Sequence, residues 1–158
     1  MARKIPFKRG QADTELAYLA GIIDGEGCFF IGQMPYKDKK HWHVFIKITS
    51  CDVCLIDWLK EHFTGCSERR NRWTSKKAFY RPVYSWTMGG ETLDYFLPLL
   101  EPYFIIKKEH CIVMKEIRKT FNKGNPVKLT SNVLEKRITL LKEMRKLNSR
   151  FHNHAIKQ

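Results

Sequence analysis

The segment LAYLAGIIDGEGCFFIG, which runs from Leu16 to Gly32, constrains the fold of this chain more than any other part of its sequence. Its first half is apolar and rich in small residues, which is typical of a helix that a second helix can approach closely. Two carboxylates, Asp24 and Glu26, follow with a glycine between them, and an aromatic run typical of a β-strand begins directly afterwards. The sequence therefore predicts a helix that ends in two acids at the start of a strand.

Basic residues outnumber acidic ones along the whole chain. The 158 residues include 29 Lys and Arg against 16 Asp and Glu, which gives a formal net charge of +13. This distributed excess favours a polyanionic partner, most often nucleic acid, although a merely soluble basic protein can have the same composition. The 43% of hydrophobic residues, with ten Phe, six Tyr and four Trp, indicate one packed domain and not a disordered arm.

The sequence contains no stretch of ~18–20 uncharged apolar residues and no apolar signal core near its N-terminus. Its five cysteines lack the spacing of a disulfide framework, which fits a reducing compartment. We therefore expect no membrane partner and an intracellular protein, in the cytoplasm of a prokaryote or in a mitochondrion or chloroplast.

One group of residues has the ligand types of a zinc site: Cys51, Cys54, His62 and Cys66. The same segment is typical of an amphipathic helix from Cys51 to His62, in which free, buried cysteines are the alternative to a metal site. The apolar face of this helix would consist of Val53, Ile56, Leu59 and Phe63.

The hydrophobic periodicity alternates between helix and strand. Asp13 can cap a helix from Thr14 to about Asp24, and the segment from Cys28 to Met34 is typical of a strand. The following segment, HWHVFIKIT, has a strict period of two. The side expected to face the core consists of Trp42, Val44, Ile46 and Ile48. The side expected to face a partner consists of His41, His43, Phe45, Lys47 and Thr49.

A second hairpin is expected between residues 67 and 90, but the pattern leaves open which of its sides faces the core. Helices are expected over Leu93 to Leu100, with an interruption at Pro98, over Ile105 to about Phe121, and over residues 131–150. Ser131 can cap the last helix, whose apolar stripe would be Leu134, Ile138, Leu141 and Met144. Its other face is basic and either solvated or bound to a partner: Lys136, Arg137, Lys142, Arg145 and Lys146.

The order of these elements, together with the acidic end of the first helix, resembles a known family. Residues 19–27, LAGIIDGEG, match the signature of the LAGLIDADG homing endonucleases at six of its nine positions. The resemblance covers residues 14–121 and, more loosely, the last helix. It implies an α+β fold of order αββαββα, in which an antiparallel, saddle-shaped sheet binds DNA, helices cover its other face, and a C-terminal helix follows. A basic arm, residues 1–13, would precede a single domain, residues 14–158.

The sequence contains one copy of the motif. Family members with a single motif are homodimers whose motif helices pair at the centre, so the resemblance implies a two-fold homodimer. The residues expected at this interface are Ala17, Ala20, Gly21 and Asp24. The same small residues are also typical of a helix packed inside one protomer.

The acids at the helix end point to a metal. Two helix C-termini and two carboxylates would converge at the dimer axis, and their negative charge would repel a DNA phosphate unless divalent cations were bound. The resemblance implies that Glu26, where the family usually has Asp, ligates Mg²⁺ beside the carbonyl of Gly25. Mn²⁺ or Ca²⁺ would substitute in binding. The alternative is a glycine turn that simply ends a helix.

The resemblance assigns two more residues to the catalytic centre. Lys107 matches a basic residue that steadies the water network or the developing charge, with Lys108 as the alternative in a shifted register. Ser50 matches a polar residue that positions solvent, although it is equally suited to cap the helix that follows.

The sheet is expected to lie in the major groove, where phosphate contacts give affinity and base contacts give specificity. The candidate base readers are His41, His43, Lys47, Thr49, Arg70, Arg72, Arg81 and Ser85. The candidate phosphate contacts at the hairpin tips are Lys37, Lys39, Lys40, Lys76 and Lys77. For each of these side chains, a solvated surface position is the alternative.

The resemblance implies a site-specific endonuclease that makes double-strand breaks in a long, pseudo-palindromic DNA target by metal-dependent phosphodiester hydrolysis. It also implies a reading frame carried within an intron. Two alternatives stay open: an RNA maturase that assists the splicing of its host intron, and a DNA-binding module that does not cut.

Overall fold

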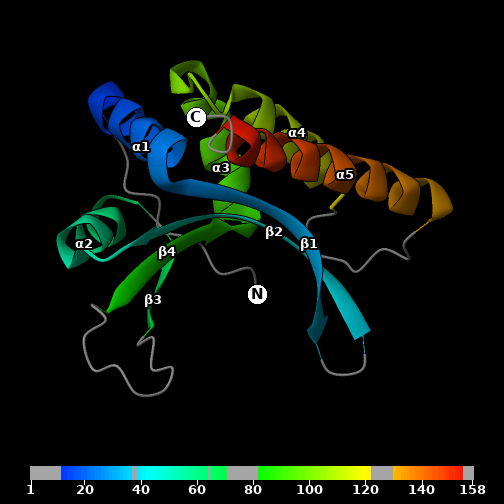
Figure 1. Cartoon of the computed structure of the whole chain (residues 1–158), viewed down its shortest axis with the longest axis horizontal. Helices are drawn as coiled ribbons and strands as arrows, with labels where there is room; N and C mark the ends of the chain where they lie inside the picture. The colour runs from blue at the N-terminus through cyan, green and yellow to red at the C-terminus, as the bar shows by residue number, and fades with distance from the viewer. Residues whose placement is uncertain (1–11, 37–38, 64, 71–81, 122–129, 155–158) are drawn as a thin grey trace.

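The computed structural model describes residues 12–36, 39–63, 65–70, 82–121 and 130–154. Their elements follow the expected order of helix, two strands, helix, two strands and further helices (Figure 1). The elements are α1 (Asp13–Glu26), β1 (Gly27–Tyr36), β2 (Lys39–Ser50), α2 (Val53–His62), β3 (Cys66–Arg70), β4 (Val83–Gly89), α3 (Gly90–Leu100), the 3-10 turn η1 (Glu101–Tyr103), α4 (Lys108–Arg118) and α5 (Ser131–His154).

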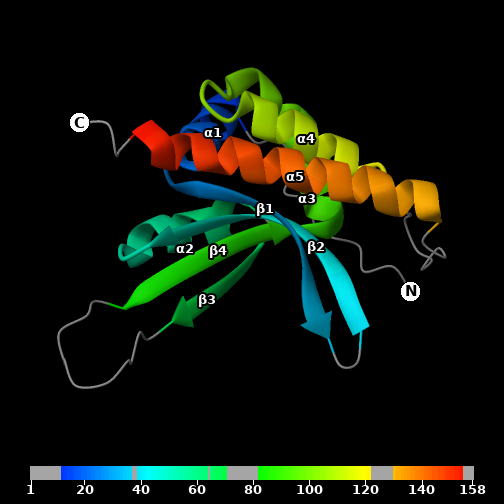
Figure 2. The same cartoon turned by 45° about the vertical axis from the view of Figure 1, so that its right-hand side comes forward.

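The strands form one antiparallel, four-stranded sheet in the order β1-β2-β4-β3. The two hairpins meet at the centre, where β2 pairs with β4 from Phe45↔Gly89 to Ser50↔Tyr84. The sheet is arched, and α1, α3, α4 and α5 lie over its convex side (Figures 1 and 2). The α+β fold and the saddle-shaped sheet are therefore confirmed, with the concave side turned away from the helices.

Side-chain alternation explains which face of the sheet is covered. On β2, Val44, Ile46 and Ile48 are buried, while Lys47 between them is only half-buried. The period of two therefore gave the correct core side for this strand.

The facing of the second hairpin, which the sequence left open, is settled by β4. Trp86 and Met88 are fully buried in the core beneath the helices. The indole of Trp86 packs so close to Gly65 that a Cβ on this glycine would lie 2.4 Å from the indole nitrogen. Only glycine fits there without displacing the tryptophan.

The first helix differs from its predicted bounds at both ends. It begins at Asp13 and has Ala12 at its N-cap position with no side-chain hydrogen bond, so the prediction that Asp13 caps the helix is wrong. Asp13 instead lies in the first turn, where a carboxylate interacts favourably with the helix dipole. The helix continues to Glu26, which is its last residue.

Three other helices begin at different residues than predicted. The second begins at Val53 and not at Cys51, because Asp52 caps it. The third helix begins at Gly90, which has a φ of +60°, and continues through Pro98 without the expected interruption. The fourth begins at Lys108 and not at Ile105, and the backbone N–H groups of the three residues before it bind a carboxylate from α1.

The last helix packs on its own protomer, against α4 and β1 (Figure 2). Its buried residues include Leu140, Met144 and Leu147. Ile138, expected in the apolar stripe, is 39% exposed. Ser131 is the first helical residue, preceded by Thr130, whose carbonyl accepts a hydrogen bond from the N–H of Leu134 at 3.0 Å.

Arg137, expected on the basic face of this helix, is buried. Its guanidinium donates to the hydroxyl and the carbonyl of Thr120 at 2.9 and 2.8 Å, and it lies 3.9 Å from the ring centroid of Phe121. Burial lowers the pKa of this guanidinium, and the nearby charge of Arg118 lowers it further. Its aliphatic stem and planar head therefore take the place of an apolar residue in the stripe.

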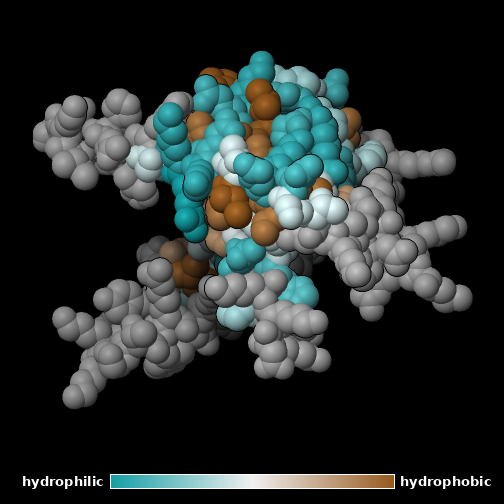
Figure 3. Space-filling model, turned by 90° about the vertical axis from the view of Figure 1, so that its right-hand side faces the viewer, coloured by the Kyte–Doolittle hydropathy of each residue, from teal (hydrophilic) through white to brown (hydrophobic). Residues whose placement is uncertain are grey.

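Figure 3 shows the face of the molecule at which α5 begins. The helical layer is mostly hydrophilic on this face, and hydrophobic residues form separate small patches there. Within the described residues, none of the helices combines the length and the apolar character that a membrane span requires.

Candidate functional site

The end of α1 is tied to the segment that precedes α4. The carboxylate of Asp24 accepts hydrogen bonds from the backbone N–H groups of Ile105, Ile106 and Lys107 at 2.8, 3.2 and 2.9 Å. A carboxylate that accepts several backbone N–H bonds is fixed in position. Asp24 therefore has the structural role predicted for the first acid of the motif.

Lys107 lies directly beneath the same helix end. Its ammonium group donates to the carbonyl oxygen of Ile23 at 2.7 Å and to that of Gly27, and its side chain is buried. The carbonyl of Ile23 lies in the last turn of α1 and also accepts the N–H of Gly27, and the carbonyl of Gly27 belongs to the residue that follows the helix and begins β1. The cation thus satisfies these acceptors and opposes the negative end of the helix dipole.

The pKa of Lys107 is lowered by burial, and the acidic groups of Asp24, Cys28 and Glu26 partly oppose this shift. The structure therefore brings Lys107 to the acidic motif, as the sequence predicted. However, its hydrogen bonds go to the backbone oxygens of Ile23 and Gly27, so this ammonium is directed into the protein.

Glu26 is exposed and has neither a hydrogen bond nor an ion pair within the described residues. Gly25 beside it is also exposed, and nothing lies within 4 Å of the position that its Cβ would occupy. A carboxylate and a backbone carbonyl are oxygen donors of the kind that Mg²⁺ prefers. A cation there would also relieve the repulsion between Glu26 and the negative end of α1.

The donor type therefore fits a divalent cation, but the number of donors from one chain is small. Within the described ranges, no cluster of three or more His, Cys, Asp or Glu side chains could hold a metal ion. A second chain, a DNA phosphate or water would have to complete the coordination shell.

The hydroxyl of Ser50 takes part in the start of α2. It accepts a hydrogen bond from the N–H of Asp52 at 3.0 Å, and the carboxylate of Asp52 caps the helix by accepting the N–H of Cys54 at 2.8 Å. Asp52 therefore caps the helix, so the alternative prediction that Ser50 is the cap is wrong, and Ser50 binds the capping residue instead. Its proton remains available to donate, since a hydroxyl can accept and donate at once.

The outer side of α1 carries a stripe of small residues. Ala17, Gly21 and Gly25 are four residues apart and exposed, and a Cβ on either glycine would meet no atom within 4 Å. Ala20 is fully buried in the protomer core, so its predicted place at a dimer interface is wrong. Asp24, also predicted there, is half-buried and bound within the protomer.

Two apolar side chains that sequence reasoning missed lie close to this stripe. Ile105 and Ile106 are 89% and 54% exposed, and Asp24 fixes their backbone beside the end of α1. A pair of adjacent isoleucines before a helix is an ordinary core signal, so the sequence gave no indication that both are exposed.

Four of the predicted base readers are described on the side of β2 that faces away from the helices. His41 and Thr49 are exposed, and His43 and Lys47 are half-buried. Ser85, predicted to read a base from β4, is only 2% exposed, so it cannot reach DNA in this conformation and that prediction is wrong. The remaining candidates lie outside the described residues or side chains: Arg70, Arg72, Arg81, Lys37, Lys39, Lys40, Lys76 and Lys77.

The cysteines do not form the zinc site that their spacing allowed within the described part of the chain. Cys51 and Cys54 are exposed, so the alternative prediction that they are buried is also wrong. His62 lies 3.0 Å from the carboxylate of Glu15 through its Nδ1 and stacks on the ring of Trp58. Val53, expected on the buried face of α2, is 40% exposed.

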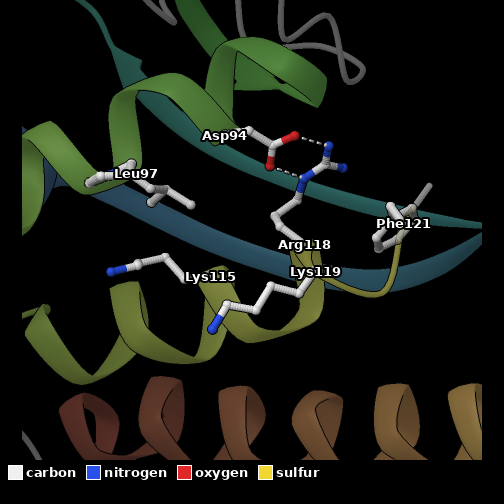
Figure 4. Close-up of a pocket in the computed structure, with 7 residues that line it drawn as sticks. Asp94, Leu97, Lys115, Arg118, Lys119 and Phe121 are labelled. Carbon is white, nitrogen blue, oxygen red and sulfur yellow. Dashed lines mark hydrogen bonds and ion pairs between the residues drawn. The ribbon is translucent and has the colours of Figure 1, made fainter. Parts of the chain in front are cut away.

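A cavity of about 280 Å³ lies between α3 and α4, away from the acidic motif (Figure 4). Arg118 forms two hydrogen bonds of 2.7 Å with the carboxylate of Asp94 at its wall. Lys115 and Lys119, which also line it, are paired with Glu101 and Glu116. Because these cations already have partners, the cavity lacks the free charges expected of a phosphate site.

No model of a protein family and no curated protein matches the chain. Solved structures do match its fold. The homing endonuclease I-CvuI, in complex with the I-CreI target in the presence of Mg, superposes with a TM-score of 0.68 at 22% identity, over 85% of this chain and 83% of that chain. The chain has the LAGLIDADG homing endonuclease fold.

Other structures with the LAGLIDADG fold are covered to different extents. The I-LtrWI LAGLIDADG homing endonuclease bound to target DNA matches with a TM-score of 0.64 at 24% identity, over 85% of this chain but 45% of that chain. The group I intron-encoded homing endonuclease I-CeuI, complexed with DNA, matches with a TM-score of 0.63 at 18% identity, over 85% of this chain and 68% of that chain. The match thus spans most of the length of the I-CvuI chain and about half of the length of the I-LtrWI chain.

Proposed function

We propose that this chain is a homing endonuclease that cuts double-stranded DNA at a specific site. The observation that carries the proposal is the exposed carboxylate of Glu26 at the end of α1, unpaired among the described residues, on a chain with the LAGLIDADG fold. Solved structures of that fold include I-SmaMI bound to cleaved DNA. The net charge of +13 supports DNA as the partner.

The active form is a homodimer in this proposal. The stripe of Ala17, Gly21 and Gly25 leaves room for a second helix to approach the backbone of α1 closely. A two-fold axis along this stripe brings the ends of two α1 helices, and therefore two Glu26 carboxylates, toward one another. Two chains with one concave sheet each fit a long, pseudo-palindromic target.

The cofactor in this proposal is Mg²⁺. Glu26 and the carbonyl oxygen of Gly25 would hold the ion, and I-CvuI was crystallised with DNA in the presence of Ca or Mg. When bound, such an ion lowers the pKa of a coordinated water and neutralises charge on the phosphate. Mn²⁺ or Ca²⁺ would substitute for binding.

The other residues of the site hold Glu26 in place. Lys107 binds the carbonyls of Ile23 and Gly27 on either side of the Glu26 position, so the backbone there has little freedom to move. Asp24 fixes Lys107 in turn by accepting its N–H. A fixed carboxylate favours catalysis because the site need not reorganise as charge develops on the phosphate.

We also infer that the reading frame lies within an intron and that the protein acts inside the cell, on an intron-free copy of its host gene. This gene supplies the test DNA. A plasmid with the intron-free sequence is incubated with the wild-type protein and with Glu26→Gln, and both cleavage and DNA affinity are measured.

We expect the wild type to cut only with a divalent cation, and Glu26→Gln to lose cleavage while its affinity changes little. The substitution removes a metal ligand and, at the same time, a charge that repels phosphate. Glu143→Gln, which neutralises an exposed carboxylate on α5, is the matched control and should cut normally. Normal cutting by Glu26→Gln would show that the assigned site is wrong.

A further inference from the structure

The ammonium of Lys107 is directed into the protein, toward the carbonyls of Ile23 and Gly27. It therefore leaves open which cation meets the DNA phosphate next to Glu26 on the concave side. Residues on the neighbouring strand β2 are the nearest candidates, because β1 begins directly after Glu26 and pairs with β2 along its whole length.

The register of this pair places Lys47 next to the acidic motif. Cys28, two residues after Glu26, lies directly opposite Lys47. Opposite Cα atoms in an antiparallel pair are about 5.5 Å apart at most and consecutive ones about 3.8 Å, so the Cα atoms of Lys47 and Glu26 are no more than about 13 Å apart. A phosphate between them is within reach of both side chains, because lysine has a long, flexible stem.

Lys47 also points to the correct side. Its neighbours Ile46 and Ile48 are buried under the helices, so Lys47 projects from the opposite, concave side. It is half-buried, and it has neither an ion pair nor a hydrogen bond within the described residues. A cation in the middle of the sheet that has no partner among the residues described is suited to an external anion.

We propose that Lys47 contacts the phosphate that is cut and stabilises the charge that develops on it, in place of reading a base. The inference rests on the proposed function, because that phosphate must lie at the metal held by Glu26. His41, on the same side of β2, is six residues and thus roughly 20 Å farther along the strand, where base pairs away from the cut would lie.

The step requires no proton from Lys47. A water oxygen forms a bond to phosphorus, one phosphorus–oxygen ester bond breaks, the leaving oxygen gains a proton, and the attacking water loses one to solvent. The Lys47 ammonium keeps its charge throughout and donates a hydrogen bond to a non-bridging oxygen, whose negative charge increases in the transition state.

A double-mutant cycle tests this contact. The affinities of the wild type and of Lys47→Met are measured in Ca²⁺ for uncut DNA that contains the sequence that the wild type cleaves. In this DNA the phosphate at the cleavage position is either unmodified or replaced by an uncharged methylphosphonate. We expect the preference for the charged phosphate to be about 10-fold smaller in Lys47→Met, as for the loss of one charge-assisted hydrogen bond. A methylphosphonate several base pairs from the cut should show no such coupling.

Two variants serve as controls. Lys142→Met removes the same charge from an exposed position on α5 and should leave the preference unchanged. Lys47→Arg keeps the charge and should retain most of the preference for the charged phosphate. This variant keeps the test valid if Lys47→Met fails to fold. Single-turnover cleavage in Mg²⁺ should fall by about 100-fold in Lys47→Met, as for the removal of one donor to a developing oxyanion.

Additive effects of Lys47→Met and the methylphosphonate would overturn the inference, and so would a changed preference at a base pair in place of the phosphate effect. In both cases the wild type would still cut, so the proposed function would stand. A wild-type protein that does not cut the target would instead overturn the endonuclease and, with it, the role of Lys47.

Discussion

Among single residues, Lys107 and Asp24 connect α1 to the segment before α4 through hydrogen bonds in both directions. Asp24 accepts three backbone N–H groups of that segment, and Lys107 donates its ammonium to the carbonyls of Ile23 and Gly27. The motif therefore contains one acid that holds the structure together and a second, Glu26, that is exposed and has no hydrogen bond or ion pair within the described residues.

The substitution Lys107→Met tests how much these hydrogen bonds contribute to the stability of the protein. The substitution removes the ammonium donor from two buried carbonyls, of which that of Ile23 keeps the N–H of Gly27, so we expect the free energy of unfolding to fall by about 1–3 kcal/mol. Chemical denaturation with urea measures the change. Lys108→Met, at an exposed neighbouring position, is the control and should change stability little; equal losses in the two variants would contradict the role of the buried ammonium.

Cys111 gives the protein a specific sensitivity to alkaline pH. Burial raises the pKa of this thiol from 9.0 to about 12, with a smaller contribution from Glu101. The unfolded chain therefore releases this proton at a lower pH than the folded chain does. The stabilisation from the neutral thiol is complete below pH 9.0 and is lost as the pH rises toward about 12.

We expect Cys111→Ala to show a weaker fall in stability between pH 9 and 11 than the wild type, although it is less stable at neutral pH. The difference in slope should approach about 1.4 kcal/mol per pH unit, the value for one proton. Urea denaturation at a series of pH values measures it. Cys28→Ala, which removes an exposed thiol, should keep the wild-type slope; identical slopes in all three proteins would refute this origin.

At the scale of elements, the strands were easier to predict than the helix ends. The period of two on β2 identified Val44, Ile46 and Ile48 as core because a strand with one covered face must alternate. The helix α4 begins later than predicted, and the segment before it binds the side chain of Asp24, about eighty residues away in the sequence, through its N–H groups. Local patterns contain no information about such a partner.

The last helix shows a second limit of sequence patterns. A basic residue is assigned by default to the solvated side, yet Arg137 is buried against Phe121 and Thr120 while Ile138 is exposed. The guanidinium can be buried because two donors are satisfied and an aromatic ring covers its plane. Neither partner could be identified without the packing of α5 on α4.

The exposed side of α1 is the element that the proposed dimer requires. Gly21→Leu should be tolerated by the protomer, because nothing lies within 4 Å of the new Cβ and leucine favours a helix over glycine. It should nevertheless separate the dimer into monomers, since the side chain fills the space that a second helix needs. Sedimentation velocity measures the mass.

The matched control is Thr139→Leu, which places the same side chain at an exposed position of α5 and should remain dimeric. A Gly21→Leu protein that sediments as a dimer would show that α1 is not the interface. A monomeric wild type would contradict the homodimer itself.

At the scale of the whole molecule, the sequence predicted the order of elements and the acidic motif, and the structure adds their arrangement in space. Sheet order follows from the pairing of β2 with β4, which no periodicity reveals. That pairing places Lys47 of β2 and Thr87 of β4 side by side on the concave face. The acidic end of α1 and the concave face thus meet at the start of β1, where one DNA strand could contact both.

In the proposed function, Glu26 and a divalent cation together cut both DNA strands. The most direct measurement follows a supercoiled plasmid with one intron-free target site after the wild-type protein and Mg²⁺ are added. We expect linear DNA to form, none to form in EDTA, and none to form with Glu26→Gln in Mg²⁺. A plasmid that stays supercoiled with the wild type would contradict the proposed endonuclease activity. A plasmid that is linearised equally by Glu26→Gln would contradict the role of Glu26 in cleavage.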